Sequence, residues 1–191
     1  MSKKAFILID YSNDLIAPDG ILSCAPTTLS LVPVVCDYME KTIAEGNFVV
    51  VCNDVHQEPD KNGKGDPYHP ETALFPSHNI KNTYGSALYP AVAEKWTEIS
   101  NEYPFETTYF EKMRFSAFVG TKLDIWLRSR DVTEVVLAGV CTDICVLHTA
   151  IEAYGKGYKI AILEKGCCST TSENHQFAID HCKNLLGATI I

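Results

Sequence analysis

Six short apolar runs, rich in Val, Ile and aromatic residues, recur along the 191-residue chain. Each run has the length and composition of a buried strand. Longer segments, in which apolar residues recur at helical spacing, separate most of these runs. The expected strands are residues 5–9, 48–52, 106–110, 134–138, 159–163 and 188–191.

The intervening segments carry the signals that begin and end helices. Gly46 and Gly187 follow two of them, as is typical of helix C-termini, and Ser172 precedes one as a candidate N-cap. Strands that alternate with helices predict a parallel sheet with right-handed crossovers. We therefore expect a doubly wound, Rossmann-like α/β fold: a six-stranded parallel sheet with helices on both faces. The expected helices are residues 29–45, 121–130, 143–155 and 173–186.

Two connections between the predicted strands are long. Residues 55–104, whose first part is rich in Pro, Gly, Asn and His, are expected to be irregular, and so long an irregular segment usually carries function. Residues 10–28 form the second connection. Neither is flanked by a second core-sized set of strands, so we expect a single domain over residues 1–191.

The composition excludes several classes of partner. The 24 acidic residues outnumber the 16 basic ones, the formal net charge is −8, and no Lys/Arg stripe is present to bind a phosphate backbone. No apolar run approaches the roughly 20 residues of a membrane span. The run at residues 5–9 is too short for a signal peptide. We expect a cytoplasmic protein that binds neither nucleic acid nor membranes.

The chain has eight cysteines but no Cys-x-x-Cys pair, which counts against a zinc ribbon or a thioredoxin-type site. In a reducing cytosol these residues are expected to remain thiols. Those interpreted as packing or loop-lining residues are Cys24, Cys36, Cys52, Cys167, Cys168 and Cys182.

Three chemically useful side chains follow different strands: Asp10, Lys112 and Cys145. In an open α/β sheet, ligands bind outside the carboxyl ends of the strands. A nucleophilic thiolate is favoured by a helix N-terminus, a cation and a base, and these are supplied by the predicted helix, Lys112 and Asp10. Each residue alone is also typical of a turn, a solvated surface or a packed core. Their combination indicates a cysteine hydrolase.

The residues around this cysteine suggest how a tetrahedral intermediate would be stabilised. The backbone amides of Cys141 and Cys145 are candidates for an oxyanion hole. The side chain of Cys141 is expected to pack rather than act as a second nucleophile. Asp143 is expected to cap the helix that carries Cys145.

Three ordered motifs resemble the isochorismatase-like cysteine hydrolases, and the resemblance spans nearly the whole chain. They are Ile-Asp-Tyr at 9–11, Lys112 before Phe-Ser-Ala-Phe at 115–118, and Gly-Val-Cys-Thr-Asp-Ile-Cys-Val at 139–146. The resemblance implies the isochorismatase-like hydrolase fold and a catalytic triad of Asp10, Lys112 and Cys145. It also implies a non-proline cis peptide bond between Val140 and Cys141.

The connection after the second strand contains a set of nitrogen and oxygen donors. Asp54 and His56 lie at the strand end, and His69, Glu71 and His78 follow. Such borderline donors suit zinc, manganese or iron(II). The alternative is a polar loop with ordinary surface histidines. The Asp-x-His spacing favours a metal site, because it directs both side chains to the same side of the chain.

This loop is similar to the metal loop of nicotinamidases, in particular the streptococcal type. The resemblance implies a divalent metal ion, zinc before manganese or iron(II), held by Asp54, His56, His78 and Glu71, with His69 as the alternative to Glu71. It also implies hydrolysis of nicotinamide, and of its analogue pyrazinamide, through a thioester on the cysteine.

The flat walls of a pyridine pocket are expected from Leu15, Phe75 and Phe115, for which core packing is the alternative. The family resemblance suggests a homo-oligomer. Two other functions stay open: another amidase or hydrolase of the same fold, and a non-catalytic metal-binding or partner-binding module. The intact set of Asp10, Lys112 and Cys145 counts against the module.

Overall fold

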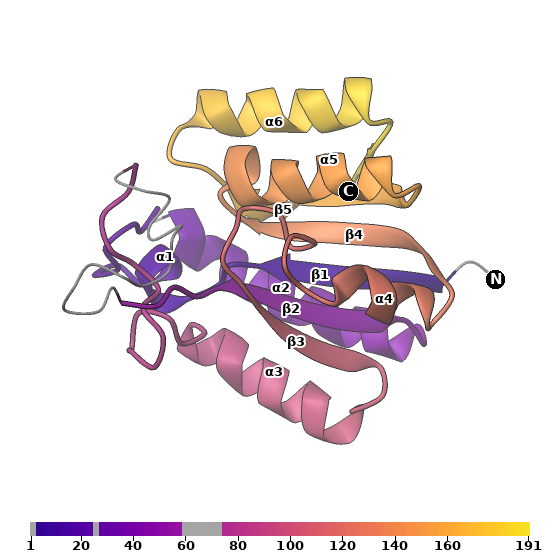
Figure 1. Ribbon diagram of the computed structural model, residues 1–191, viewed down its shortest axis with the longest axis horizontal. Helices are drawn as coiled ribbons and strands as arrows, with labels where there is room; N and C mark the ends of the chain where they lie inside the picture. Colours follow the sequence, from indigo (N-terminus) through magenta and orange to yellow (C-terminus); the bar gives the residue numbers. More distant parts are fainter. Residues whose placement is uncertain (1–2, 25–26, 59–73) are drawn as a thin grey trace.

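The computed structural model describes residues 3–24, 27–58 and 74–191. Within these residues a six-stranded parallel sheet forms in the order β3-β2-β1-β4-β5-β6 (Figure 1). The predicted doubly wound fold and its six strands are confirmed. The strands are β1 Lys3–Ile9, β2 Phe48–Asp54, β3 Thr107–Lys112, β4 Val132–Val140, β5 Lys159–Cys168 and β6 Thr189–Ile190.

Strands β4 and β5 continue beyond their predicted ends at residues 138 and 163. The apolar pattern stops there because glycines and charged residues interrupt it, but the backbone remains extended. Gly139 permits a close approach to β1, since a Cβ atom at this position would lie 2.3 Å from the carbonyl oxygen of Ile9. The continuation of β4 brings Cys141 to the edge of the sheet.

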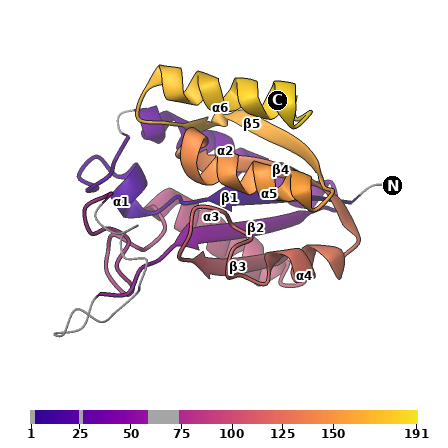
Figure 2. The same cartoon turned by 45° about the horizontal axis from the view of Figure 1, so that its top comes forward.

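The strand order places a ligand crevice at the centre of the sheet. Strand β1 pairs with β2 on one side and with β4 on the other. The chain moves outward from β1 to β3 and then returns to begin β4, so the carboxyl ends of β1 and β4 form a topological switch point. Asp10 follows β1 and Cys141 follows β4 at this crevice. In Figure 2 the loops after β1 and β2 gather at the same end of the sheet, opposite the N-terminus.

Helices cover both faces of the sheet. Helices α2 and α3 contact each other, as do α5 and α6. Figure 1 shows α4 and α5 in front of the sheet and α2 behind it. The elements are α1 Asn13–Ile16, α2 Thr27–Ala44, α3 Pro90–Glu102, α4 Leu123–Arg128, the π-helix η1 Thr142–Val146, α5 Leu147–Gly155 and α6 Ser172–Leu185.

The prediction that residues 55–104 are irregular is wrong in its second half, because α3 occupies Pro90–Glu102. Pro90 begins the helix, where its missing N–H costs no hydrogen bond. Val92 and Ile99 are buried, and Trp96 packs partly against the core. These three residues repeat at helical spacing, and the polar residues between them obscured the pattern.

Two predicted helix caps are also wrong. The side chain of Thr171, not Ser172, accepts a hydrogen bond from the backbone N–H of Asn174 at the start of α6. Asp143 does not cap the helix that carries Cys145, because Cys141 occupies that position. Instead the Asp143 carboxylate accepts a hydrogen bond from the Ser169 hydroxyl, which joins η1 to the loop after β5.

The two predicted helix-ending glycines are confirmed. Gly46 and Gly187 have φ angles of 72° and 65°, the left-handed conformation that glycine adopts without steric cost. Both lie just beyond the last residue of a helix. Among the described residues, no helix combines the length and apolar character that a membrane crossing requires.

Candidate active site

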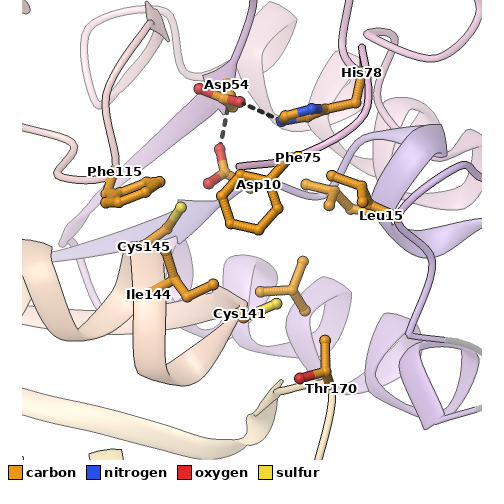
Figure 3. Close-up of a pocket in the computed structure, with 12 residues that line it drawn as sticks. Asp10, Leu15, Asp54, Phe75, His78, Phe115, Cys141, Ile144, Cys145 and Thr170 are labelled. Atoms are coloured by element: carbon orange, nitrogen blue, oxygen red, sulfur yellow. Dashed lines mark hydrogen bonds and ion pairs between the residues drawn. The ribbon is translucent and has the colours of Figure 1, made fainter. Parts of the chain in front are cut away.

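Four strand ends contribute to one pocket at the carboxyl edge of the sheet. Asp10 follows β1, Asp54 ends β2, Lys112 ends β3, and the loop that follows β4 leads to Cys145. Figure 3 shows Asp54 joined to both His78 and Asp10, with Cys145 farther from Asp54 and near Phe115. The sheet itself therefore positions the residues that the sequence singled out.

The backbone conformation of Asp10 directs its carboxylate into the pocket. Its φ angle is 61°, in the left-handed region that Asp tolerates better than most residues. Its backbone N–H donates to the carbonyl of Cys52 at 3.0 Å, and its Oδ1 accepts from the backbone N–H of Asp54 at 2.7 Å. Both partners belong to β2, so the Asp10 carboxylate is fixed relative to that strand.

Lys112 lies between the carboxylates and the thiol, and its side chain is fully buried. Its Nζ is 2.8 Å from Asp10 Oδ2, 3.5 Å from Asp54 Oδ1 and 3.6 Å from Cys145 Sγ. Burial lowers the pKa of Lys112, but the charges of Asp10, Cys145 and Asp54 raise it more, so the pKa lies well above its usual value. The ammonium stays charged and compensates the two carboxylates.

Cys145 is held in the π-helical turn η1, and its sulfur reaches the pocket. The Thr149 hydroxyl donates to the carbonyl of Cys145 at 2.7 Å and accepts from the N–H of Ala117 at 3.0 Å. Burial and the charge of Asp10 raise the pKa of the Cys145 thiol well above its usual value, although Lys112 lowers it. The resting thiol is therefore protonated.

The proton on this thiol has a nearby acceptor. Burial raises the pKa of Asp10, Lys112 lowers it, and the result is a carboxyl with a pKa above its usual value. Asp10 and Cys145 both lie against Lys112, whose Nζ is 2.8 Å from Asp10 Oδ2 and 3.6 Å from Cys145 Sγ. The raised pKa makes Asp10 a better base than an exposed aspartate.

Asp54, His56 and His78 form the second cluster, and their donor atoms lie within 4.8 Å of one another. Asp54 Oδ2 is 2.8 Å from His56 Nε2 and 3.3 Å from His78 Nε2. Burial raises the pKa of Asp54, but Lys112 and the hydrogen bond of His56 lower it far more, so the carboxylate is ionised.

The orientation of His78 fits a metal ligand. Its Nδ1 lies 2.8 Å from the carbonyl of Pro76 and must donate to it. In a neutral imidazole the other nitrogen, Nε2, then presents a lone pair toward the Asp54 carboxylate, an arrangement that a shared cation stabilises. Three buried N and O donors of this kind suit a divalent metal ion. Glu71 and its alternative His69 lie outside the described residues.

A cluster that the sequence did not reveal supports the two histidines. The backbone N–H of Asn79 donates to Asp14 Oδ2 at 2.7 Å, and the Ser12 hydroxyl donates to Asn79 Oδ1 at 2.7 Å. The carbonyl of Asn79 accepts from the backbone N–H of His56 at 2.9 Å. We call Ser12, Asp14 and Asn79 the loop clasp, because they fasten the segment that carries His78 to the start of α1.

An apolar pocket of about 590 Å³, a volume that includes space open to solvent, is lined by Asp10 and Cys145 of the triad and by Asp54 and His78 of the metal cluster. The three predicted wall residues, Leu15, Phe75 and Phe115, all line it (Figure 3). The ring centroids of Phe75 and Phe115 lie 6.4 Å apart, and the two rings meet edge to face. Lining residues that the sequence did not suggest are Leu22, Val140, Ile144 and Thr170.

The predicted oxyanion-hole residues lie beside this pocket. The peptide bond between Val140 and Cys141 is cis, as the family resemblance implied. Cys141 lines the pocket together with Cys145, and its carbonyl accepts from the N–H groups of Ile144 and Val146 in the turn.

Comparison with known proteins agrees with this geometry. The family model described as the isochorismatase domain matches residues 4–191. The isochorismatase family protein PncA of Bacillus subtilis is 43% identical over 188 residues, covering 98% of each chain. A pyrazinamidase/nicotinamidase of Streptococcus mutans superimposes with a TM-score of 0.90 at 44% identity, over 99% of this chain and 100% of the other. The structure of nicotinamidase PncA from Bacillus subtilis gives a TM-score of 0.88 at 41% identity, over 98% of both chains. By sequence, fold and strand-end chemistry, this chain is a member of the isochorismatase family.

Proposed function

We propose that this protein is a nicotinamidase, which hydrolyses the carboxamide C–N bond of nicotinamide to give nicotinate and ammonia and also accepts pyrazinamide. The observation that carries the proposal is a buried Cys-Lys-Asp cluster next to a metal-type cluster, with residues of both lining one apolar pocket. The relatives named as nicotinamidases and pyrazinamidases support the choice of substrate.

In the first half of the reaction, Asp10 removes the proton from Cys145 as the sulfur attacks the carboxamide carbon. Both groups line the same pocket, and Lys112 Nζ lies within 3.6 Å of each, so the acid and the thiol are neighbours. Lys112, 3.6 Å from the sulfur, stabilises the thiolate as it forms. The backbone amides of Cys141 and Cys145 donate to the oxyanion. Asp10 returns the proton to the nitrogen, the C–N bond breaks, and ammonia leaves a thioester on Cys145.

In the second half, Asp10 deprotonates a water molecule that attacks the thioester carbon. The C–S bond breaks, nicotinate leaves, and the proton returns to Cys145. The same carboxylate serves twice because its position is fixed by Lys112 at 2.8 Å and by the Asp54 N–H at 2.7 Å. A base held in this way has no reorganisation to make between the two steps.

The metal cluster would hold the substrate from its other end. Asp54, His56 and His78, with Glu71 as a fourth ligand, are proposed to hold a divalent ion, zinc before manganese or iron(II). When bound, the ion would act as a Lewis acid toward the ring nitrogen of the substrate. Leu15, Phe75 and Phe115 would contact the faces and edges of the ring.

The test is ammonia release from nicotinamide by the purified protein, measured beside pyrazinamide, an N-carbamoyl amide and a vinyl ether such as isochorismate. We expect turnover of the two aromatic amides alone. Chelation should remove most activity, and added zinc should restore it. Turnover that a chelator leaves unchanged would contradict the metal role, and preference for another substrate would contradict the nicotinamidase assignment.

We further propose that the chain works as a single domain and as a homo-oligomer in the cytoplasm, where nicotinate would enter NAD salvage. The expected absence of a nucleic acid or membrane partner rests on the charge and hydropathy of the sequence. Light scattering during gel filtration measures the oligomeric state, and a monomeric mass at working concentration would contradict the proposed homo-oligomer.

A further inference from the structure

Three cysteines that the proposed reaction does not use as nucleophiles meet beside the pocket. Cys24 lies after α1, Cys141 lies between β4 and η1, and Cys168 ends β5. The sulfur atoms of Cys24 and Cys141 are 4.0 Å apart. Segments far apart in the sequence thus bring these two sulfurs close together.

The three sulfurs differ in protonation. Hydrogen bonds from Cys141 and Cys168 lower the pKa of Cys24 to about 3, although partial burial opposes the shift. The hydrogen bond with Cys24 and burial raise the pKa of Cys141, and the same two causes raise that of Cys168. Cys24 is therefore the thiol of this cluster that loses its proton most readily.

All eight cysteines of the chain are described, and Cys24 is the only one whose pKa is lowered. Burial raises the pKa of Cys52 and of Cys167 to about 12, and it also raises that of Cys145. Cys24 is only partly buried. An accessible thiolate beside a second thiol is the arrangement found in cysteines that respond to oxidants.

We propose that Cys24 and Cys141 are an oxidation site, at which a hydroperoxide drives formation of a reversible disulfide that switches the active site off. Geometry carries the proposal: the two sulfurs lie 4.0 Å apart at the pocket edge, and Cys141 is also an oxyanion-hole residue.

The chemistry balances with the peroxide as the oxidant. The Cys24 thiolate attacks one peroxide oxygen, the O–O bond breaks, and with one proton taken up the products are a sulfenic acid and water (or an alcohol). The Cys141 sulfur then attacks the Cys24 sulfur, the S–O bond breaks, and a second water leaves. Both electrons accepted by the peroxide come from the two thiol sulfurs. A dithiol reductant reverses the reaction by exchange.

The disulfide would change the site because its two partners border the pocket. A disulfide bond requires an S–S distance of about 2.05 Å, so the sulfur atoms of Cys24 and Cys141 must approach each other by about 2 Å. Leu22, two residues before Cys24, and Cys141 itself both line the pocket. A displacement of about 1 Å at a catalytic geometry costs about 10²-fold, so we expect a loss of that order in kcat/KM.

The first test maps the bond without reference to activity. The Cys145→Ala protein, which lacks the proposed nucleophile, is exposed to hydrogen peroxide and alkylated, and its peptides are analysed by mass spectrometry without reduction. We expect two peptides, one with Cys24 and one with Cys141, joined by a cross-link. Their combined mass should be lower by two hydrogen atoms, and the cross-linked species should disappear after treatment with dithiothreitol. A pair that joins Cys24 to Cys168, or no cross-link, overturns the proposal.

The second test follows ammonia release after a brief peroxide pulse. We expect the parent protein to lose about 10²-fold in kcat/KM and to recover with dithiothreitol. Cys24→Ser should have ordinary activity and resist the pulse. Cys36→Ser is the matched control, because Cys36 is also partly buried but bonds to the Ala91 carbonyl on α3, and it should respond like the parent. Equal loss in Cys24→Ser would show direct oxidation of Cys145 and overturn the proposal.

Discussion

The two ends of the pocket are built in different ways. At the thiol end, Asp10, Lys112 and Cys145 sit directly at strand ends or in the turn that follows one, so the register of the sheet determines where they lie. At the metal end, Asp54 is the only one of the three described donor residues that belongs to a strand. His56 and His78 lie in connecting segments that the loop clasp holds by hydrogen bonds. One active site can therefore combine a reacting centre fixed by strands with a metal site whose position depends on loop contacts.

The largest effect is expected from Cys145→Ala, which removes the reacting atom from the rigid end. The kcat for ammonia release should fall by about 10⁶-fold, as for other covalent nucleophiles. Metal content should stay unchanged, because the donor atoms of Asp54, His56 and His78 do not depend on this sulfur. A parallel loss of metal would show that the two ends are not separable.

Lys112→Met tests how far the rigid end depends on its central cation. The variant leaves the fully buried Asp10 carboxylate without its 2.8 Å partner, and breaking such a pair costs about 3–5 kcal/mol. Chemical denaturation measures the loss. Lys81→Met is the control: Lys81 pairs with Glu111 at 2.6 Å, but both are exposed, so about 0–1 kcal/mol is expected. Equal losses would contradict the account of the buried pair.

Alkylation across pH compares two sulfurs beside the same pocket. Because hydrogen bonds lower the pKa of Cys24 to about 3, we expect this residue to react with iodoacetamide already below neutral pH. Cys145 has a raised pKa, so its labelling at pH 7 should be slower than that of free cysteine, which is about a few per cent thiolate, and should rise with pH. Mass spectrometry of labelled peptides gives both rates. Fast labelling of Cys145 at pH 6 is the contrary result.

Asn79→Ala weakens the loop clasp without touching a metal ligand. We expect metal affinity to fall by about 10–100-fold, while kcat at saturating metal stays close to that of the parent. Asn79→Gly separates the causes, because it keeps the left-handed backbone, with φ of 48°, and removes only the side chain. Zinc titration against a chelating dye is the measurement. A large fall in kcat at saturating metal would show that the clasp also positions the thiol end.

The smallest effect is expected outside both ends. Thr171→Ala removes the side-chain cap of α6 and should cost about 1 kcal/mol of unfolding free energy, with little change in kcat. Ser172→Ala is the matched control and should cost less, because Ser172 does not cap the helix. A larger loss of unfolding free energy in Ser172→Ala than in Thr171→Ala would instead support Ser172, the cap predicted from the sequence.

The rigid end could be predicted from the sequence because strand ends are visible in it. An apolar run that stops at Asp10, and another that leads to Lys112, identify both the sheet edge and the side chains that meet there. The protonation of Cys145 could not be predicted in the same way, since burial outweighs the effect of Lys112 and depends on the packed structure.

The loop contacts were harder to foresee. Nothing in the spacing of Ser12, Asp14 and Asn79 shows that they meet, because the contacts join residues 65 or more positions apart. Helix α3 was missed for another reason, since polar residues outnumber the buried Val92 and Ile99 along it. The thiol cluster was interpreted as packing because its members come from three separate segments.

The hydrogen bond between Asp54 and Asp10 limits the sequence changes that this molecule can tolerate. The backbone N–H of Asp54 donates to the Asp10 carboxylate, while the side chain of the same residue belongs to the metal cluster. The pairing of Ile9 with Cys52 fixes this relation, and a slip of one residue between β1 and β2 would turn the Asp54 side chain to the opposite face of the sheet. The alignment of the two strands therefore has almost no freedom to drift, because a change in it would disturb the Asp10 carboxylate and the metal cluster at the same time.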